Sequence, residues 1–524
     1  GYAIKGLTAP LFHTTSASFK GLHLVDVDMV SNITAKADRF YGALVGLLKP
    51  VTGVTELSVE NCSVSGKIKL HNPNYAVRDN IFLGGLIGAS YGAVIDSCES
   101  SVTITNNQYN NGSVTIKSFG FGGVVGIATY SGEMYTSISN TKFAGEIDLN
   151  IKEQIGTNAN VGGVVGYIQG SYNLVSNVSN CESSGTIKFQ TTASATNVIV
   201  GGIAGTASEA ASKATSVLNM SNCKSSGAVE VSGTITTANV GGVAGIAAVK
   251  AATVQMTNCE NSAAVAIGGT ITTPCVGGIT GYAIGNADSA FTGLTNSGSV
   301  TVKSGAVMSA TSAISGIAGI SKSCHMDTVV NNGAIVVEEG AKIVTCYIGG
   351  IIGIGTKDGA VTTVQNLTNN GPITYNGEAV DATTATQLRV GGVIAYTQSA
   401  ILNATNTGDI TIAGSLNPGT ATPETFTEAK GDCYAGVVAY KTMTSTNKVT
   451  NTGNITVTAT MNSLAGEGKK AQVNIAGLVG YTSNNINAAN ETEYKSVSSG
   501  DITVSGNTTN CTLCIGGSIA HPYT

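Results

Sequence analysis

The sequence contains no tryptophan, and only 5% of its 524 residues are aromatic and 11% are charged. Soluble domains ordinarily carry about 25% charged residues, so hydroxyl and amide side chains must supply most of the polar surface here. The formal net charge is −5, and no cluster of Lys and Arg is dense enough to follow a phosphate backbone. We therefore expect no nucleic-acid partner.

Long apolar runs are also missing. No stretch reaches the roughly 18 apolar residues that a membrane-spanning helix needs, so no transmembrane helix is expected. The opening segment GYAIKGLTAPLF lacks the basic region, apolar stretch and cleavage site of a signal peptide. A disordered chain is excluded, because 42% of the residues are hydrophobic and they recur in phase.

The sequence offers no constellation for catalysis or metal binding. Its five histidines fall at unrelated positions, and neither HExxH nor a recurring carboxylate pair occurs. The eleven cysteines are an odd number, and the CTLC of Cys511 and Cys514 has no second half of the zinc-ribbon kind. The GGxGxDxφx nonapeptide of calcium β-rolls is absent. We predict no catalytic residue, no cofactor and no metal site.

What the sequence does contain is a repeat. A Gly-Gly-φ-φ-Gly phrase, which we call the anchor, recurs at intervals of 34 to 44 residues, in some copies with Ala or Ser in place of Gly. The copies end at Gly46, Gly88, Gly126, Gly166, Gly205, Gly245, Gly281, Gly319, Gly353, Ala395, Ala439, Gly480 and Ala520. Glycine weakens a strand, so its recurrence predicts a corner where two backbones pass too closely for a Cβ.

A second phrase, of the form N-C-x-x-S-G-x-I, lies between anchors. A β-branched residue always stands two positions after the glycine of this phrase, which we call the turn glycine and which is Val102 or Ala263 in two copies: Ile68, Ile104, Ile147, Ile187, Val229, Val265, Val300, Ile335, Ile373, Ile410, Ile455 and Ile502. Apolar residues two positions apart, as in Ile187 and Phe189, indicate a strand with one buried face. Each cassette should thus give about three short strands that must stack on neighbouring cassettes to form a core.

These patterns predict an all-β fold, a parallel β-helix (β-solenoid) of about 13 degenerate repeats of roughly 40 residues, with one coil per cassette. We expect residues 1–524 to form a single continuous solenoid and to be a segment of a longer chain. Residues 1–46 would be a divergent N-terminal coil and residues 47–524 the repeats.

Two polar columns invite a functional interpretation but have a structural one. Five cysteines stand four before the turn glycine, where later copies have Leu, Val or Ala: Cys62, Cys98, Cys181, Cys223 and Cys259. That exchange predicts buried thiols, with disulfides between stacked copies as the alternative.

Two sets of asparagines could contact calcium or glycans, but stacked amides that bond one another along the axis are the simpler interpretation. The first set precedes the cysteine column and the second lies two before the turn glycine: Asn61, Asn140, Asn180, Asn222, Asn258, Asn366 and Asn403; Asn296, Asn331, Asn369, Asn406 and Asn451.

Other repeated or clustered side chains are also interpreted as structural and not as binding residues. Tyrosines after the anchor alternate with isoleucines, which favours packing over sugar stacking. A threonine column (Thr301, Thr374, Thr411, Thr456, Thr503) is interrupted by Val336, so a flat ice-binding array is not expected. The acidic residues Glu424, Glu428 and Asp432 are interpreted as part of a solvated insertion.

The cassette resembles the GLUG repeat of secreted and cell-surface bacterial proteins. The copy that carries the resemblance best is VGGVVGYIQGSYNLVSNVSNCESSGTIKF, residues 161–189, and the likeness extends over nearly the whole chain. The opening APLFHTTSASFKGLHLVDVDM is similar to the first coil of such adhesin-like proteins. The resemblance implies a repeat architecture and an extracellular or cell-surface location, and no particular activity.

The function predicted is a non-enzymatic extracellular structural or adhesive protein, a stalk or filament subunit at a bacterial cell surface. Its expected partners are further copies or domains joined end to end, or a host or bacterial surface glycan or protein, since an open solenoid end exposes unpaired strand edges. One alternative is a carbohydrate-active β-helix enzyme, a lyase or hydrolase, although few charges and no tryptophan disfavour a catalytic cleft. Another is a glycan-binding module with its specificity in the loops 71–80, 151–158 and 416–432.

Overall fold

The computed structural model describes residues 2–32, 39–71, 78–106, 115–132, 134–170, 175–209, 217–248, 253–286, 288–357, 362–419, 431–442, 446–464, 470–482 and 496–522. Every helix or strand element in these ranges is a β-strand, and the pairings between strands of successive cassettes are parallel. None of the described segments forms a helix suited to spanning a membrane. The predicted all-β parallel solenoid is confirmed.

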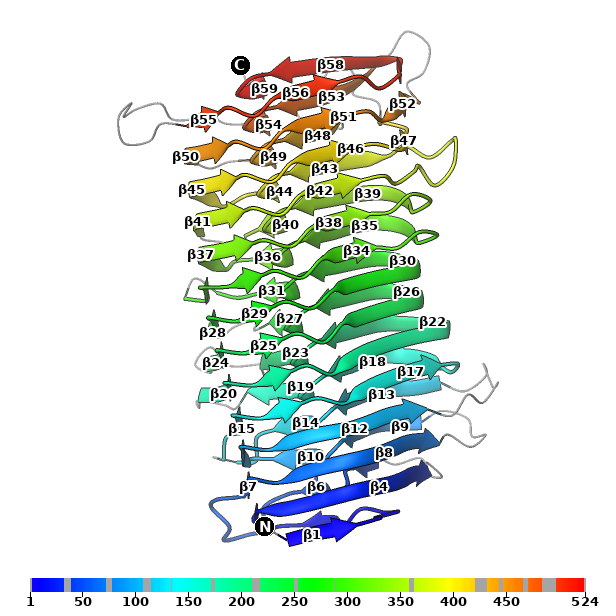
Figure 1. Cartoon of the computed structure of the whole chain (residues 1–524), viewed down its shortest axis with the longest axis vertical. Coiled ribbons are helices and arrows are strands. Elements are labelled where there is room, and N and C mark those ends of the chain that lie inside the picture. Colours follow the sequence, from blue (N-terminus) through cyan, green and yellow to red (C-terminus); the bar gives the residue numbers. More distant parts are fainter. Residues whose placement is uncertain are drawn as a thin grey trace. The chain divides into compact units, whose positions relative to one another are not determined.

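The chain forms two compact units. Unit 1 comprises Gly1–Val265 with Ile279–Ser289, and unit 2 comprises Ala266–Gly278 with Ala290–Thr524. In each unit successive coils follow one another in sequence order (Figure 1).

Every anchor ends in a short strand, and these strands form one parallel ladder in each unit. In unit 1 the ladder is β2 (Phe12–Thr15), β6 (Val45–Leu48), β10 (Ile87–Tyr91), β14 (Val125–Thr129), β19 (Val165–Gly170), β23 (Ala204–Glu209), β27 (Ala244–Ala248) and β31 (Thr280–Ile284). In unit 2 it is β36 (Ala318–Lys322), β40 (Ile352–Thr356), β44 (Ile394–Thr397), β49 (Val438–Lys441), β54 (Val479–Thr482) and β59 (Ile519–Pro522). The ladders agree with the predicted repeat number of about 13.

The remaining strands form the rest of each coil. In unit 1 they include β7 (Ser58–Glu60), β8 (Ser63–His71), β9 (Arg78–Gly84), β11 (Val94–Asp96), β12 (Glu99–Asn106), β13 (Thr115–Gly122), β15 (Ser137–Ser139), β16 (Lys142–Phe143), β17 (Glu146–Ile151), β18 (Gln154–Gly162), β20 (Val175–Ser179), β21 (Glu182–Ser183), β22 (Thr186–Gly201), β24 (Val217–Ser221), β25 (Lys224–Ser225), β26 (Val229–Gly241), β28 (Thr253–Thr257) and β29 (Glu260–Asn261). In unit 2 they include β32 (Ala290–Thr292), β33 (Thr295–Asn296), β34 (Val300–Val302), β35 (Val307–Ser315), β37 (His325–Asn331), β38 (Ile335–Val337), β39 (Lys342–Gly349), β41 (Thr363–Asn369), β42 (Ile373–Tyr375), β43 (Gln387–Gly391), β45 (Ala400–Asn406), β46 (Ile410–Ile412), β48 (Asp432–Ala435), β50 (Thr446–Asn451), β51 (Ile455–Val457), β53 (Ala471–Ala476), β55 (Val497–Ser498), β56 (Ile502–Val504) and β58 (Cys511–Gly516).

Register shows that one cassette makes one coil. β22 pairs with β26 so that Ile187 lies opposite Val229 and Gly201 opposite Gly241, which are the same positions of consecutive cassettes. β22 also runs unbroken from the β-branched column to the next anchor, so the strand after the turn glycine is longer than the short one expected. The extension arises because alternate residues of this segment, among them Phe189, Thr191 and Ala195, continue to face the core.

The β-branched column forms the core in both units. Ile187 and Val229 are buried in unit 1, and the unit 2 series Val300, Ile335, Ile373, Ile410 and Ile455 is fully buried and aligned in register. Burying such a side chain contributes about 1.5–3 kcal/mol, so the column is the main source of stability.

The anchor glycines mark the predicted close corner. A Cβ built on Gly123 would overlap the carbonyl oxygen of Gly163, one coil further on, and the ring of Phe143. A Cβ on Gly166 would crowd the backbone of Phe121, in the strand that enters the preceding corner. At these two glycines the obstructing atoms include backbone that cannot rotate away, so a Cβ would force the corner to shift.

Candidate functional site

Each coil bends sharply just before the cysteine column. The residue at the bend has a positive φ, and in most coils it is asparagine: 52° at Asn180, 53° at Asn222 and 52° at Asn366. Asparagine tolerates this left-handed conformation better than other residues with a Cβ, because its short polar side chain bonds locally. All seven asparagines of the first predicted set occupy this bend, and we call them the corner asparagines: Asn61, Asn140, Asn180, Asn222, Asn258, Asn366 and Asn403.

The corner asparagines bond one another between coils. Asn222 Nδ2 donates to Asn180 Oδ1 at 3.1 Å, Asn180 Nδ2 donates to Asn140 Oδ1 at 3.2 Å, and Asn403 Nδ2 donates to Asn366 Oδ1 at 2.6 Å. This confirms the amide stacking. Most of these side chains are exposed, and their contacts with one another support a structural role.

The second asparagine set forms a buried ladder in unit 2. Asn331 Nδ2 donates to Asn369 Oδ1, and Asn369 Nδ2 donates to Asn406 Oδ1, both at 2.8 Å. Each amide also donates to the carbonyl two residues on, as Asn369 does to Gly371 at 2.9 Å. All five side chains are fully buried, so they satisfy turn backbone groups, as predicted, and are out of reach of a calcium ion or a glycan in solvent.

Two aspartates use the same bend to clamp neighbouring coils. Asp327 Oδ1 accepts from Asn366 Nδ2 at 2.7 Å and from Thr328 Oγ1 at 3.0 Å, and Asp327 Oδ2 accepts from Gln365 Nε2 at 2.9 Å. In unit 1, Asp96 Oδ1 accepts from Asn140 Nδ2 at 2.7 Å and from Ser139 Oγ at 2.6 Å. Hydrogen bonds, that of Asn366 first, lower the pKa of Asp327, so the carboxylate is ionised at neutral pH.

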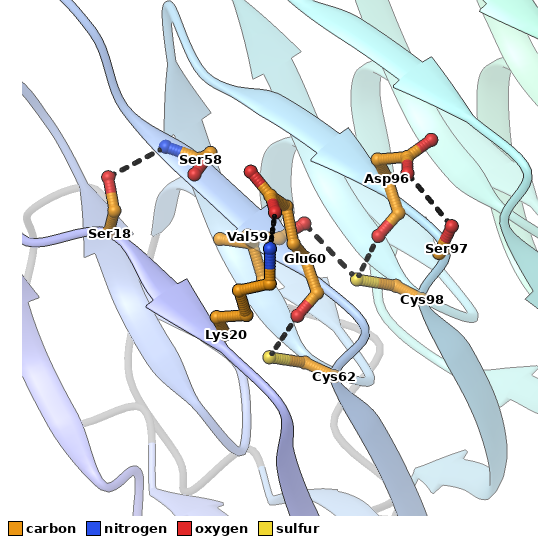
Figure 2. Close-up of polar contacts among 9 residues, drawn as sticks. All are labelled: Ser18, Lys20, Ser58, Val59, Glu60, Cys62, Asp96, Ser97 and Cys98. Carbon is orange, nitrogen blue, oxygen red and sulfur yellow. Dashed lines mark hydrogen bonds and ion pairs between the residues drawn. The ribbon is translucent and has the colours of Figure 1, made fainter. Parts of the chain in front are cut away.

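Figure 2 shows the surroundings of the Asp96 clamp, where thiols and an ion pair lie close together. Cys98 Sγ donates to the carbonyl oxygens of Val59 and Asp96, both at 3.4 Å, and Cys62 Sγ donates to that of Glu60 at 3.3 Å. Burial raises the pKa of Cys98 to about 12. The Lys20–Glu60 pair, 2.8 Å apart, lies at the surface. The thiols are therefore packing residues and not nucleophiles.

All eleven cysteines are free, and all but Cys511 and Cys514 are buried. The buried-thiol interpretation of the five-cysteine column is confirmed, and its continuation by Val329, Leu367 and Ala404 is equally buried. Cys511 and Cys514 are half-buried residues of β58.

The outward column next to these cysteines differs between the units. In unit 1 it alternates in charge along paired strands, with Lys142 bonded to Glu182 at 2.9 Å and Lys224 to Glu260 at 3.1 Å: Glu99, Lys142, Glu182, Lys224 and Glu260. In unit 2 the same column is neutral: Thr295, Val330, Thr368, Thr405, Thr450 and Val497. Exposed ion pairs stabilise by at most about 1 kcal/mol, so the contrast concerns surface chemistry more than stability.

A pocket of about 370 Å³ opens on unit 2 beside the Asp327 clamp. We call it the His325 pocket, and strands β32, β37 and β41 line it with Ala290, Thr292, His325, Met326, Asp327, Thr363 and Gln365. His325 Nδ1 accepts from the Thr363 backbone N–H at 3.2 Å, which places the proton of the neutral ring on Nε2. Small-molecule sites usually measure about 300–1,000 Å³, so the pocket suits a small ligand.

Comparison with known families matches residues 157–188 to the GLUG motif. The match is consistent with a GLUG-repeat protein. The match covers the anchor that ends at Gly166 and the turn glycine Gly185, hence the corner and the start of β22. No curated protein and no solved structure matches the chain.

The late coils of unit 2 also contain a polar cluster that the sequence patterns did not single out. The Arg389 guanidinium lies 3.8 Å from the ring centroid of Tyr440 and 5.7 Å from that of Tyr396, and Tyr440 stacks on Tyr481 at 4.7 Å. Arg389 is only 7% exposed, and Tyr440 and Tyr481 are buried. The predicted packing role of these tyrosines is confirmed. A lone arginine in one repeat gives no periodic signal.

Asp432 corrects one expectation. It was grouped with Glu424 and Glu428 as part of a solvated insertion, but its side chain is fully buried. Its Oδ1 accepts from the Leu388 N–H and its Oδ2 from Tyr434 Oη, both at 2.9 Å, and burial raises its pKa to about 7. Glu424 and Glu428 lie outside the described residues.

Of the three loops expected to carry binding specificity, one is mostly strand and two lie mostly outside the described residues. Residues 151–158 are mostly strand, because β17 ends at Ile151 and β18 begins at Gln154. Most of the loops 71–80 and 416–432 lies outside the described residues, at 72–77 and 420–430. Among the histidines, His23 Nδ1 lies 2.8 Å from Ser63 Oγ, and only His325 is among the residues that line the His325 pocket.

Proposed function

We propose that this chain is a non-enzymatic structural or adhesive protein of the bacterial cell exterior, acting as a stalk or as a filament subunit. The GLUG motif and the β-solenoid fit a surface or structural repeat protein. The extracellular location and the adhesive role are inferred from this architecture.

One observation carries the proposal: every strictly repeated polar column is engaged in folding. The corner asparagines link coils, the buried asparagines bond the turns, and the cysteine column packs in the core. In an enzyme built on a repeat scaffold, a nucleophile and a general base would lie within hydrogen-bond reach of each other in a cleft.

The surface composition supports the same conclusion. Outward columns of unit 2 contain several threonines and asparagines, and some of these side chains bond between coils, as in Asn370 Nδ2 to Asn332 Oδ1 at 2.8 Å. Such a neutral surface suits prolonged contact with other macromolecules better than electrostatic steering of a small charged substrate.

Protease treatment of intact cells that make the protein tests the location. Peptides of this chain should be released from intact cells at the rate of a known surface protein, while a cytoplasmic marker stays intact. A chain protected until the cells are lysed would sink the proposal. Electron microscopy of native material tests the form, since isolated single particles would count against a filament subunit.

A further inference from the structure

We propose that the His325 pocket binds one uncharged, hydroxyl-rich sugar residue of a glycan chain. The inference rests on the proposed adhesive function and names its ligand class. It starts from the hollow beside β37, where half-buried polar side chains from successive coils face a common volume of about 370 Å³.

The hydrogen-bonding groups of the pocket form a mixed set. Among the described residues, His325 makes one hydrogen bond, through Nδ1, so its Nε2–H is available as a donor. Gln365 Nε2 is engaged by Asp327, which leaves Gln365 Oε1 as an acceptor. The hydroxyls of Thr292 and Thr363 can donate or accept. A sugar hydroxyl also both donates and accepts, so it can satisfy such a set where an apolar or purely acceptor ligand cannot.

The clamp on Asp327 argues against charged ligands. Its carboxylate is ionised, since hydrogen bonds from Asn366 and Gln365 lower its pKa. It lines the pocket and would therefore repel an anion bound there. A metal ion needs three or more ligands, and no group of three His, Cys, Asp or Glu is arranged to hold one within the described residues. An organic cation could not accept from the His325 Nε2–H, so a neutral polar ligand fits the mixed set best.

The neighbouring surface explains why the sugar would belong to a chain. Beyond the bend, the next outward column is the neutral series that contains Thr295, Thr368 and Thr405. Its rungs repeat at about 4.8 Å, the spacing of paired strands. A glycan that leaves the pocket along the stack would meet a hydroxyl or a small apolar group at every rung, with no charge to desolvate.

The test uses the full chain on an array of immobilised neutral and acidic glycans, with four variants. Asp327→Ala, His325→Ala and Gln365→Ala alter the pocket. Asp96→Ala is the matched control, because Asp96 makes the same clamp to Asn140 in unit 1 and is not part of the pocket. In His325→Ala and in Gln365→Ala, we expect binding to neutral glycans to fall about tenfold or more, the effect of one lost hydrogen bond to ligand. Asp327→Ala should also weaken binding, because Gln365 Nε2 loses the partner that orients it. Binding should be unchanged in Asp96→Ala.

Thermal unfolding of each variant separates binding from folding. If Asp327→Ala melts well below Asp96→Ala, the His325→Ala and Gln365→Ala variants decide. Absence of neutral-glycan binding, a preference for acidic glycans, or binding that survives His325→Ala and Gln365→Ala would each overturn the proposal. Should no glycan bind while protease still releases the chain from intact cells, the sugar site falls and the structural function stands.

Discussion

Asn366 donates a 2.7 Å hydrogen bond from Nδ2 to Oδ1 of Asp327, one coil earlier, while its own backbone has a φ of 52°. One residue thus shapes the bend of its own coil and links it to the preceding coil. The bond to the preceding coil depends on the bend, since the bend directs the Asn366 amide toward that coil.

Substitution of Asn366 should separate these two tasks. Asn366→Gly keeps the bend and loses the bond, and should destabilise by about 1 kcal/mol, whereas Asn366→Ala also strains the backbone and should cost about 2–3 kcal/mol. Urea unfolding at pH 7 measures the difference. Because the folded-state pKa of Asp327 is lowered, the part of the loss due to its carboxylate should be present above about pH 4 and disappear as pH falls through the folded pKa. Equal losses in the two variants would refute this division.

The buried asparagine ladder predicts that Asn369→Ala destabilises the protein much more than the same substitution at the neighbouring Asn370. Asn369→Ala removes the partners of Asn331, Asn406 and the Gly371 carbonyl inside the core, and should destabilise by about 2–4 kcal/mol. Asn370→Ala, at an exposed position with side-chain bonds to Asn332 and Thr407, should cost less than about 1 kcal/mol. Parallel urea titrations provide the comparison, and similar midpoints would show that the ladder contributes little.

The corner glycines predict intolerance to a single methyl group. Gly123→Ala places a Cβ against the Gly163 carbonyl oxygen and the Phe143 ring, and should destabilise by about 3 kcal/mol. Gly156→Ala is the control, because its Cβ would lie 3.2 Å from the Thr115 methyl group and at ordinary contact distance, 3.6 Å and 3.9 Å, from Ile116 O and Lys117 Cα. A circular-dichroism melt that shows no loss in Gly123→Ala would disprove the close corner.

Buried Asp432 predicts a pH dependence of stability. Burial raises its folded-state pKa to about 7, while the unfolded carboxyl titrates near its usual value of about 4. Stabilisation by the protonated group is therefore complete below about pH 4 and is lost as pH rises to about 7, by an amount on the order of 4 kcal/mol. Asn can accept from Leu388 and donate to Tyr434 without ionising, so Asp432→Asn should be more stable than wild type at pH 8 and comparable at pH 4. A constant offset across this range in urea titrations would contradict the assignment.

Thiol reactivity should follow burial. Brief alkylation with iodoacetamide at pH 8, followed by mass spectrometry, should modify Cys511 and Cys514 first and leave the buried thiols such as Cys98 and Cys324 intact until urea is added. Burial raises the pKa of both Cys98 and Cys324 to about 12, which adds to their steric protection. Recovery of a disulfide between Cys181 and Cys223 from native protein would favour the rejected alternative.

Features that recur along the chain were predictable from the sequence. The β-branched column, the corner glycines, the cysteine column and both asparagine sets are periodic, and their residue types each fit one role in a stacked coil. The side-chain chemistry of Gly123 or Asn369 is enough to infer a close corner or an amide ladder, because the same requirement is imposed at every turn.

Features that occur once could be decided only by the tertiary structure. Asp432 looked solvated because acidic residues surround it in sequence, yet the fold buries it beside Tyr434. The His325 pocket brings together three segments, separated by some 70 residues from Ala290 to Thr363, whose side chains share no sequence pattern. Periodicity determines which residues stack, since equivalent positions of successive coils pack against one another. The side chains that meet across coils at a single site depend on register and on local departures from the repeat, and these are set only when the coils are folded together.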